Sequence, residues 1–392
     1  MPNNIETSTN FNRDVLNLYS CLNQICIPND NGSDCLDLES LFNALHLLYE
    51  GTADSSRNEL KNTDLQCMID LINSTPKSSS SSRLGVYIDK EFEFQDNYVE
   101  NLQSKGYAFD VVPTEENLRK KVNARVKEIF PNYHKLEEDF FEGSLSTDVR
   151  VCIKTHSYFH PKWQTPFPSQ QTKLRNFDVG EETLHIPTLV SYEKEEILTY
   201  DNTKKNLFFV SLPFQGEDYG MVIVMPKKPH TKKQLLDLIT NKTITAEDLR
   251  DFHAYQGEQK DYIKKRFPLI NIKTRWDLEK VTVPFDEMDP DKCSSVSYLK
   301  TIMSDQLNLM NISTSLSPGS FNGISLLSST DIIFSADGTD SGASVSENAV
   351  DCSVKLKHNP ILHIDKSFLF FVVKNMGETI LISKIGCFVG PV

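Results

Sequence analysis

The sequence has no long apolar run and no recognisable leader. Hydrophobic residues make up 39% of its 392 residues, yet no stretch approaches the ~20 consecutive apolar residues that a membrane-spanning helix needs. The first residues, "MPNNIETSTNFNRD", lack the basic start and apolar core of a secretory signal. We therefore expect a protein without a membrane span. It is cytoplasmic or released without a leader if Met1 is the true start, and secreted if a signal peptide precedes it.

Positive charge is also in deficit. The chain has 41 Lys and Arg against 54 Asp and Glu, which gives a formal net charge of -13. Nucleic acids and anionic membranes are bound by clustered Lys and Arg, so this balance argues against both as the main partner. It leaves room for a local basic patch.

The cysteines lack the spacing of a metal site. The eight cysteines include no CxxC pair and no Cys/His ligand pattern, which predicts mostly free thiols, no metal and no cofactor. The sequence also contains glycosylation sequons. These point instead to a secretory compartment, because sequons are glycosylated only there. The four candidates are Asn31, Asn73, Asn241 and Asn311.

Catalytic motifs are missing too. The sequence contains no GxSxG elbow, no HExxH helix and no glycine-rich phosphate or dinucleotide loop. His156 and His160 lie in or beside an expected strand, where a structural or exposed role is favoured over metal binding. The acidic run at 135–143 fits a solvated helix end, and Trp163 and Trp276 fit core or strand-edge anchors. We therefore expect a protein that is not an enzyme.

The order of patterns predicts an α+β fold. Apolar residues at helical spacing indicate helices over 11–25, 37–51 and 114–130, with a polar loop over 73–82. From residue 148 onward, apolar runs typical of strands dominate, with one more helix around 231–240. Helices followed by strands favour helices packed on a large, mainly antiparallel sheet. The expected strands cover 83–88, 148–159, 206–214, 219–226, 267–276, 330–336, 366–374 and 378–385.

One segment does not fit this pattern. Residues 335–350, "SADGTDSGASVSENAV", lie between two buried-strand patterns and contain small residues, no Pro and no turn that would close a hairpin. In an extended chain Thr339, Ser341, Ala343 and Val345 share one face, with Asp340, Gly342, Ser344 and Ser346 on the other. A flexible linker would explain the Gly and Ser content.

Five motifs, in order, resemble the serpin family from about Val15 to the C-terminus. They are "LFNALHLLYEGTADSSRNEL", "THSYFHPKWQTPF", "FVSLPFQGEDYGMVIVMP", "SFNGIS" and "KSFLFFVVKNMGETILISKI". The resemblance implies a serpin fold: one domain over 1–392, with helices packed on three β-sheets. It also implies an exposed hinge and reactive-centre loop over 335–357. The hinge would be Gly338, Thr339, Asp340, Ser341, Gly342 and Ala343.

The resemblance implies an inhibitor that is used once per protease. A serine protease cuts the loop, the loop inserts into the central sheet as a new strand, and the acyl-enzyme is trapped in a covalent complex. The inhibitor itself is expected to be a monomer. The alternatives are a non-inhibitory serpin that acts as carrier, chaperone or storage protein, and an inhibitor of caspases or other cysteine proteases that uses Asp351.

Two ways of counting along the sequence give different positions for the cleaved bond. Counting forward from Gly338 by the family's spacing gives Cys352–Ser353, whereas counting backward from "KSFLFF" gives a bond near Leu356. Lys355 would attract a trypsin-like protease, Cys352 and Leu356 suit apolar pockets, and Asp351 suits a caspase. The expected window is Asp351, Cys352, Ser353, Val354, Lys355 and Leu356.

The chain departs from the family pattern at several positions. Ala336 stands where an acidic residue is usual, and Thr155 replaces an Asn. The Ser-Pro-x-Ser start of the second helix becomes "DLES", which keeps Ser40 and brings in the carboxylate of Asp37. This change predicts a different opening of the sheet beneath the loop. Residues 281–299 are extra and are expected to form a surface insertion.

Overall fold

The computed structural model describes part of the chain in detail. The described residues are 3–26, 32–50, 80–89, 92–94, 100, 104, 108–112, 151–168, 172–191, 195–215, 219–255, 260–277, 312–314, 324–335, 361–375 and 377–391. The expected helix over 114–130, the acidic run at 135–143 and the insertion at 281–299 lie outside these residues.

Four helices lie within the described part of the chain: α1 (Asn3–Cys26), α2 (Leu38–Glu50), α7 (Lys232–Thr240) and α8 (Ala246–Ala254). Three of them confirm predicted helices, although α1 begins well before residue 11. Sequence reasoning missed α8, which a capping box marks: the side chain of Thr245 accepts from the backbone of Asp248, whose side chain accepts in return. None of these helices has the length and apolar character needed to cross a bilayer.

The strands form three sheets among the described residues. A ten-stranded sheet has the order β1-β17-β16-β10-β9-β8-β11-β7-β6, with β15 beside β11, and all its pairs but β11–β15 are antiparallel. This confirms the predicted α+β class and its large, mainly antiparallel sheet. The strands are β1 (Asp34–Asp37), β6 (Lys173–Val179), β7 (Glu182–Val190), β8 (Glu195–Asn202), β9 (Leu207–Pro213), β10 (Tyr219–Pro226), β11 (Lys260–Pro268), β15 (Ile361–His363), β16 (Phe368–Asn375) and β17 (Ile380–Phe388).

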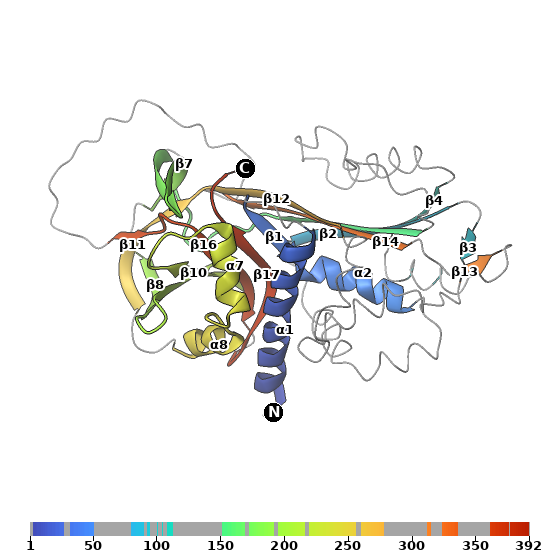
Figure 1. Ribbon diagram of the computed structural model, residues 1–392, viewed down its shortest axis with the longest axis horizontal. Coiled ribbons are helices and arrows are strands. Elements are labelled where there is room, and N and C mark those ends of the chain that lie inside the picture. The colour runs from blue at the N-terminus through green and yellow to red at the C-terminus, as the bar shows by residue number, and fades with distance from the viewer. Residues whose placement is uncertain are drawn as a thin grey trace.

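The second sheet has five strands in the order β12-β14-β5-β2-β4, and the third is the small pair β13-β3. Figure 1 shows α2 below the long strands of the five-stranded sheet, and α1, α7 and α8 beside the ten-stranded sheet. The strands are β2 (Ser80–Asp89), β3 (Phe92–Phe94), β4 (Ala108–Val112), β5 (Val151–Phe159), β12 (Ile270–Asp277), β13 (Ile312–Thr314) and β14 (Ile324–Phe334).

Two predicted segments were wrong in detail. The polar loop expected over 73–82 ends earlier, because Ser80, Ser81 and Ser82 pair with the last residues of β5 and begin β2. The strand expected over 267–276 is two strands: Pro268, which has no N–H to donate, ends β11, and β12 continues in the other sheet. Strands β6, β7 and β8 were not assigned from sequence.

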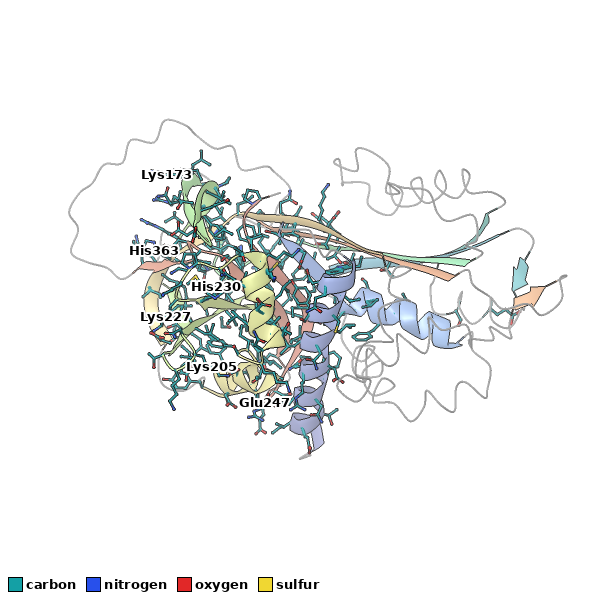
Figure 2. All side chains as sticks on the ribbon, in the orientation of Figure 1. Lys173, Lys205, Lys227, His230, Glu247 and His363 are labelled. Atoms are coloured by element: carbon teal, nitrogen blue, oxygen red, sulfur yellow. The ribbon has the colours of Figure 1, made fainter. Side chains whose placement is uncertain are left out.

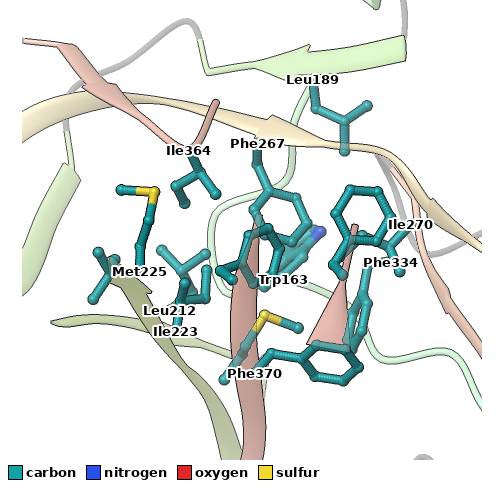
Figure 3. Close-up of a cluster of buried hydrophobic side chains, with 14 of the residues drawn as sticks. Trp163, Leu189, Leu212, Ile223, Met225, Phe267, Ile270, Phe334, Ile364 and Phe370 are labelled. Atoms are coloured by element: carbon teal, nitrogen blue, oxygen red, sulfur yellow. The ribbon is translucent and has the colours of Figure 1, made fainter. Parts of the chain in front are cut away.

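The core lies where the two large sheets meet. Trp163 and Trp276 are 1% and 0% exposed, which confirms their prediction as core anchors. Figure 3 shows Trp163 surrounded by Phe267, Phe334 and aliphatic side chains from several strands. Cys21, Cys35 and Cys387 are free thiols, as predicted, and the other five cysteine side chains lie outside the described set.

Candidate functional site

The candidate site is the seam between β5 and β14, because β14 leads directly into the segment that sequence analysis singled out. β14 pairs antiparallel with β12 on one side and parallel with β5 on the other. The parallel register runs from Ile324 opposite Val151 to Ile332 opposite Phe159. Ser335 is the last described residue of the chain after β14, and the next described residue is Ile361.

This topology defines what the seam can accept. A chain that turns back at the end of β14 runs antiparallel to β14, and therefore also antiparallel to β5. It could lie between them and bond to both strands, but only after the β5–β14 ladder has opened. The geometry therefore suits a sixth strand supplied by the residues that follow Ser335.

The middle of the seam is lined by small polar side chains. Thr155, Ser157 and Thr330 are each at most 1% exposed on the buried face of the sheet. Ser157 and Thr330 face each other, and their hydroxyl oxygens are 3.3 Å apart, longer than the usual 2.7–2.8 Å or so of a hydroxyl hydrogen bond. Such small polar side chains contribute little apolar packing between β5 and β14. The backbone hydrogen bonds of the ladder therefore contribute most of what holds these two strands together.

Aromatic side chains pack at the end of the seam where β14 ends. The indole Nε1 of Trp163 donates to the carbonyl of Ser335 at 2.9 Å, and its ring lies 5.7 Å from that of Phe334. The rings of Phe159 on β5 and Phe334 on β14 are 6.0 Å apart, edge to face. This packing fixes β14 next to β5 at the point where the chain leaves the sheet.

His160 belongs to the same end of the seam. Its Nε2 lies 2.8 Å from the hydroxyl of Ser335, and its Nδ1 lies 3.3 Å from the hydroxyl of Tyr158. These contacts give His160 the structural role that the sequence favoured. The side chain of His156 lies outside the described set.

A buried ion pair lies beneath β5. Asp37 is the residue before α2, and its carboxylate accepts from the backbone N–H of Ser40 at 3.2 Å, which is an N-cap interaction. The same carboxylate lies 2.9 Å from Nζ of Lys384 on β17, and the two side chains are 0% and 1% exposed. Nζ of Lys384 also lies 5.0 Å from the centre of the Phe159 ring. Asp37 therefore joins α2, β17 and one strand of the seam.

The carboxylates keep Lys384 charged despite its burial. Burial alone lowers the pKa of a lysine, but Asp37 and Glu39 outweigh that effect, and the pKa of Lys384 is raised. The carboxylate of Glu39 is in turn bound by the hydroxyl of Ser383 at 3.1 Å. The charge of Lys384 is thus compensated by two acidic residues, which are Glu39 of α2 and Asp37, the residue before α2.

A second buried pair stands next to the first. Asp34 on β1 lies 2.7 Å from Nζ of Lys232 on α7, with exposures of 0% and 3%, and accepts a hydrogen bond from the hydroxyl of Tyr19. Burial, followed by the charge of Asp34, raises the pKa of Tyr19. Gly386 allows this close packing, because a Cβ there would lie 2.3 Å from the carbonyl oxygen of Asp34. The second pair ties β1 to the helices that cover the larger sheet.

Most of the predicted site residues lie outside the described part of the chain. The hinge from Gly338 to Ala343 and the window from Asp351 to Leu356 lie outside the described residues, as do Asn31, Asn73 and Asn311. Asn241 is exposed and caps the C-terminal end of α7, where its backbone N–H donates to the carbonyl of Asp237 at 2.9 Å.

Sequence reasoning found Asp37 but missed its partner. Lys384 lies in the middle of the apolar run "ILISKIGCF", and a charge in such a run is a signal of a buried partner. Lys232 and Asp34 carry no comparable signal, because both lie in polar surroundings in the sequence.

Comparisons with known proteins agree with this geometry. The family model described as Serpin (serine protease inhibitor) matches residues 31–386. An uncharacterized serpin-like protein of Methanosarcina acetivorans is 20% identical over 279 residues, or 64% of this chain and 60% of that protein. Human plasminogen activator inhibitor 2 is 25% identical over 199 residues, or 49% of this chain and 46% of that protein.

The chain thus spans about half to three fifths of the length of these curated relatives. The solved structure of thyroxine-binding globulin in complex with thyroxine has the same fold, with a TM-score of 0.71 at 16% identity over 99% of both chains. Because the family model covers nearly the whole chain, this protein belongs to the serpin family.

Proposed function

We propose that this protein inhibits serine proteases by a suicide-substrate mechanism in which the cleaved loop inserts between β5 and β14. The observation that carries the proposal is the parallel β5–β14 seam, with small polar residues at its middle, next to a strand that continues into residues 335–350. Once this ladder opens, β5 and β14 each free one edge, and one antiparallel strand could pair with both edges.

The covalent step uses the protease's own chemistry. The serine Oγ of the protease attacks the carbonyl carbon of the scissile bond, an ester forms, and the C–N bond breaks as the new amine takes up a proton. Water would normally hydrolyse this ester. Insertion of the released N-terminal half of the loop carries the esterified protease away from its starting position before hydrolysis, so each inhibitor is used once.

The loop sequence supports this use. We propose Gly338, Thr339, Asp340, Ser341, Gly342 and Ala343 as the hinge that enters the seam first. Their side chains are small except for Asp340, and alternate residues of an inserted strand point to opposite faces of the sheet. A flexible linker explains the composition but gives no reason for its position directly after β14.

We propose Lys355–Leu356 as the cleaved bond within the window Asp351–Leu356. A lysine before the cut fits the acidic specificity pocket of a trypsin-like protease. Elastase-like or chymotrypsin-like targets would instead use Cys352 or Leu356, and a caspase would use Asp351. The partner is accordingly one protease, held covalently by one inhibitor monomer whose single domain covers 1–392.

Incubation with trypsin, chymotrypsin, pancreatic elastase and a caspase tests the proposal. We expect a complex with trypsin that survives denaturing electrophoresis, and a released C-terminal fragment that starts at Leu356 by mass spectrometry. Lys355→Gln should abolish the trypsin complex, whereas the matched control Lys357→Gln should keep it. A fragment starting at Cys352 or Ser353 would refute the Lys355 assignment, and cleavage by every protease without any complex would refute inhibition.

A carrier function is the second candidate. The specific observation in its favour is the fold similarity to thyroxine-binding globulin, whose structure holds thyroxine. This similarity shows the fold alone at 16% identity. Cleavage of the loop without complex formation, in the experiment above, is the result that a carrier would give.

A further inference from the structure

Basic residues gather on one face of the ten-stranded sheet, at the end formed by β6, β7, β11 and β15. Arg175 on β6 lies opposite Ile186 of β7, and Arg266 on β11 lies opposite Val190. Residues 186 and 190 are four apart on one strand and therefore share a face, so the two arginines share it too. His363 on β15 lies opposite Arg266 and belongs to the same face.

The three side chains are close enough to influence one another. Nη1 of Arg266 lies 3.5 Å from Nδ1 of His363. Burial, followed by the charge of Arg266, lowers the pKa of His363, and Arg175 contributes in the same direction. Asp365 acts against them and does not reverse the shift. We call Arg175, Arg266 and His363 the basic cluster.

Two lysines extend the basic cluster. Lys173 is two residues before Arg175 and Lys264 is two before Arg266, so both lie on the same face of their strands. Figure 2 labels Lys173 near the β6–β7 hairpin and His363 at the edge of the same part of the molecule. This concentration of positive charge stands out in a chain whose formal net charge is -13.

One donor of the basic cluster has no acceptor among the residues that the structure describes. The Nε of Arg175 is buried and makes no hydrogen bond to any of them. A buried N–H without an acceptor destabilises the fold, and an incoming oxygen atom would relieve that cost. The Nε–H of Arg175 and the surplus of positive charge favour the same kind of ligand. That ligand is an anion with several acceptor oxygens.

We propose that the basic cluster binds a phosphate or sulfate group. Guanidinium groups present two parallel N–H donors that match the oxygens of such anions, which explains two arginines at one site. The imidazole of His363 adds a further donor when it is protonated. The group is carried either by a free anion or by an ester on a larger molecule. The proposal does not depend on protease inhibition.

Titration of the full chain with inorganic sulfate, pyrophosphate and a sulfated polysaccharide tests the site. We expect saturable binding that weakens as NaCl rises, and at least tenfold weaker binding in Arg175→Gln and in Arg266→Gln. Arg250→Gln is the matched control, since Arg250 is a partly exposed arginine of α8 that pairs with Asp251, and α8 lies at the other end of the ten-stranded sheet's lobe in Figure 1. It should bind like the unaltered protein.

A second measurement does not depend on the folding of any variant. An anion in the basic cluster should raise the pKa of His363 measured by NMR in the unaltered protein, because it offsets Arg175 and Arg266. Tight binding of inorganic sulfate or pyrophosphate identifies a free anion as the ligand, and tighter binding of the polysaccharide identifies an ester. No saturable binding of any probe, or an unmoved His363 titration on binding, would overturn the proposal.

Discussion

Lys384 shows how a single charge can decide the stability of the region under the seam. Its ammonium group is buried, and the charge that compensates it comes chiefly from Asp37. Removal of one member of such a pair leaves the other charge buried without compensation, which costs far more than the pair contributes when intact.

Lys384→Met should therefore lower the free energy of unfolding by roughly 3–5 kcal/mol. Lys227→Met is the matched control, because Lys227 forms an ion pair of similar length, 2.8 Å, with Asp201, but on the surface with side-chain exposures of 39% and 48%. The control should cost no more than about 1 kcal/mol. Urea unfolding followed by intrinsic fluorescence measures both.

The double variant Asp37→Asn with Lys384→Met separates charge from packing. An asparagine can still accept from the N–H of Ser40 but leaves no buried charge, so the double variant should be more stable than Lys384→Met alone. If the double variant loses at least the sum of the two single losses, the ion pair is not the reason for the destabilisation.

The same residues show the reach of sequence reasoning. Asp37 stood out because it replaces a serine expected from the family resemblance, and Trp163 because tryptophan side chains are most often core or strand-edge anchors. The contact of Asp37 with Lys384 joins residues at opposite ends of the chain. No local pattern predicts such a pair, since it depends on how β1 and β17 pair in the folded molecule.

At the scale of elements, the inserted strand would have to obey the period-two rule. If the hinge enters the seam, Thr339 and Asp340 would point to opposite faces of the sheet, and we predict that Thr339 takes the face covered by α2. The covered face holds Ser157 and Thr330, which are both 0% exposed, so a long cation placed there would be buried beside neutral side chains.

Thr339→Arg should therefore block insertion, while Asp340→Arg, its neighbour on the other face, should permit it. We expect Thr339→Arg to be cleaved at a normal rate without forming a complex stable to denaturing electrophoresis, and Asp340→Arg to retain most of the complex. A ratio of complex to cleaved inhibitor that is equal in the two variants would show that inhibition does not use this face.

Elements were predictable from sequence where their signals are local. Strands β9, β10, β16 and β17 are continuous apolar runs, and α7 has an apolar stripe, so all were predicted. Strands β6 and β7 were missed because polar residues such as Arg175, Asp178 and His185 interrupt their apolar pattern. The seam itself was not predictable from local patterns, because β5 and β14 are far apart in the sequence. Ser157 and Thr330, which face each other across the seam, are separated by 173 residues.

At the scale of the whole molecule, the proposed mechanism requires that the intact protein is not in its most stable state. A strand between β5 and β14 would add hydrogen bonds on both of its edges, where the present ladder satisfies only one set. The intact fold would then persist because the loop is tethered at both ends, at Ser335 and Ile361, and a cut removes that tether.

A cut in the loop should therefore raise the unfolding temperature. If the inserted strand contributes on the order of 10 kcal/mol, the midpoint rises by roughly 12 °C for a protein of this size. Differential scanning calorimetry before and after limited proteolysis measures this, with Thr339→Arg cut in the same way as the control that should show no rise. An unaltered protein whose midpoint stays the same after a confirmed cut does not insert its loop, and its function would then be sought among the non-inhibitory serpins.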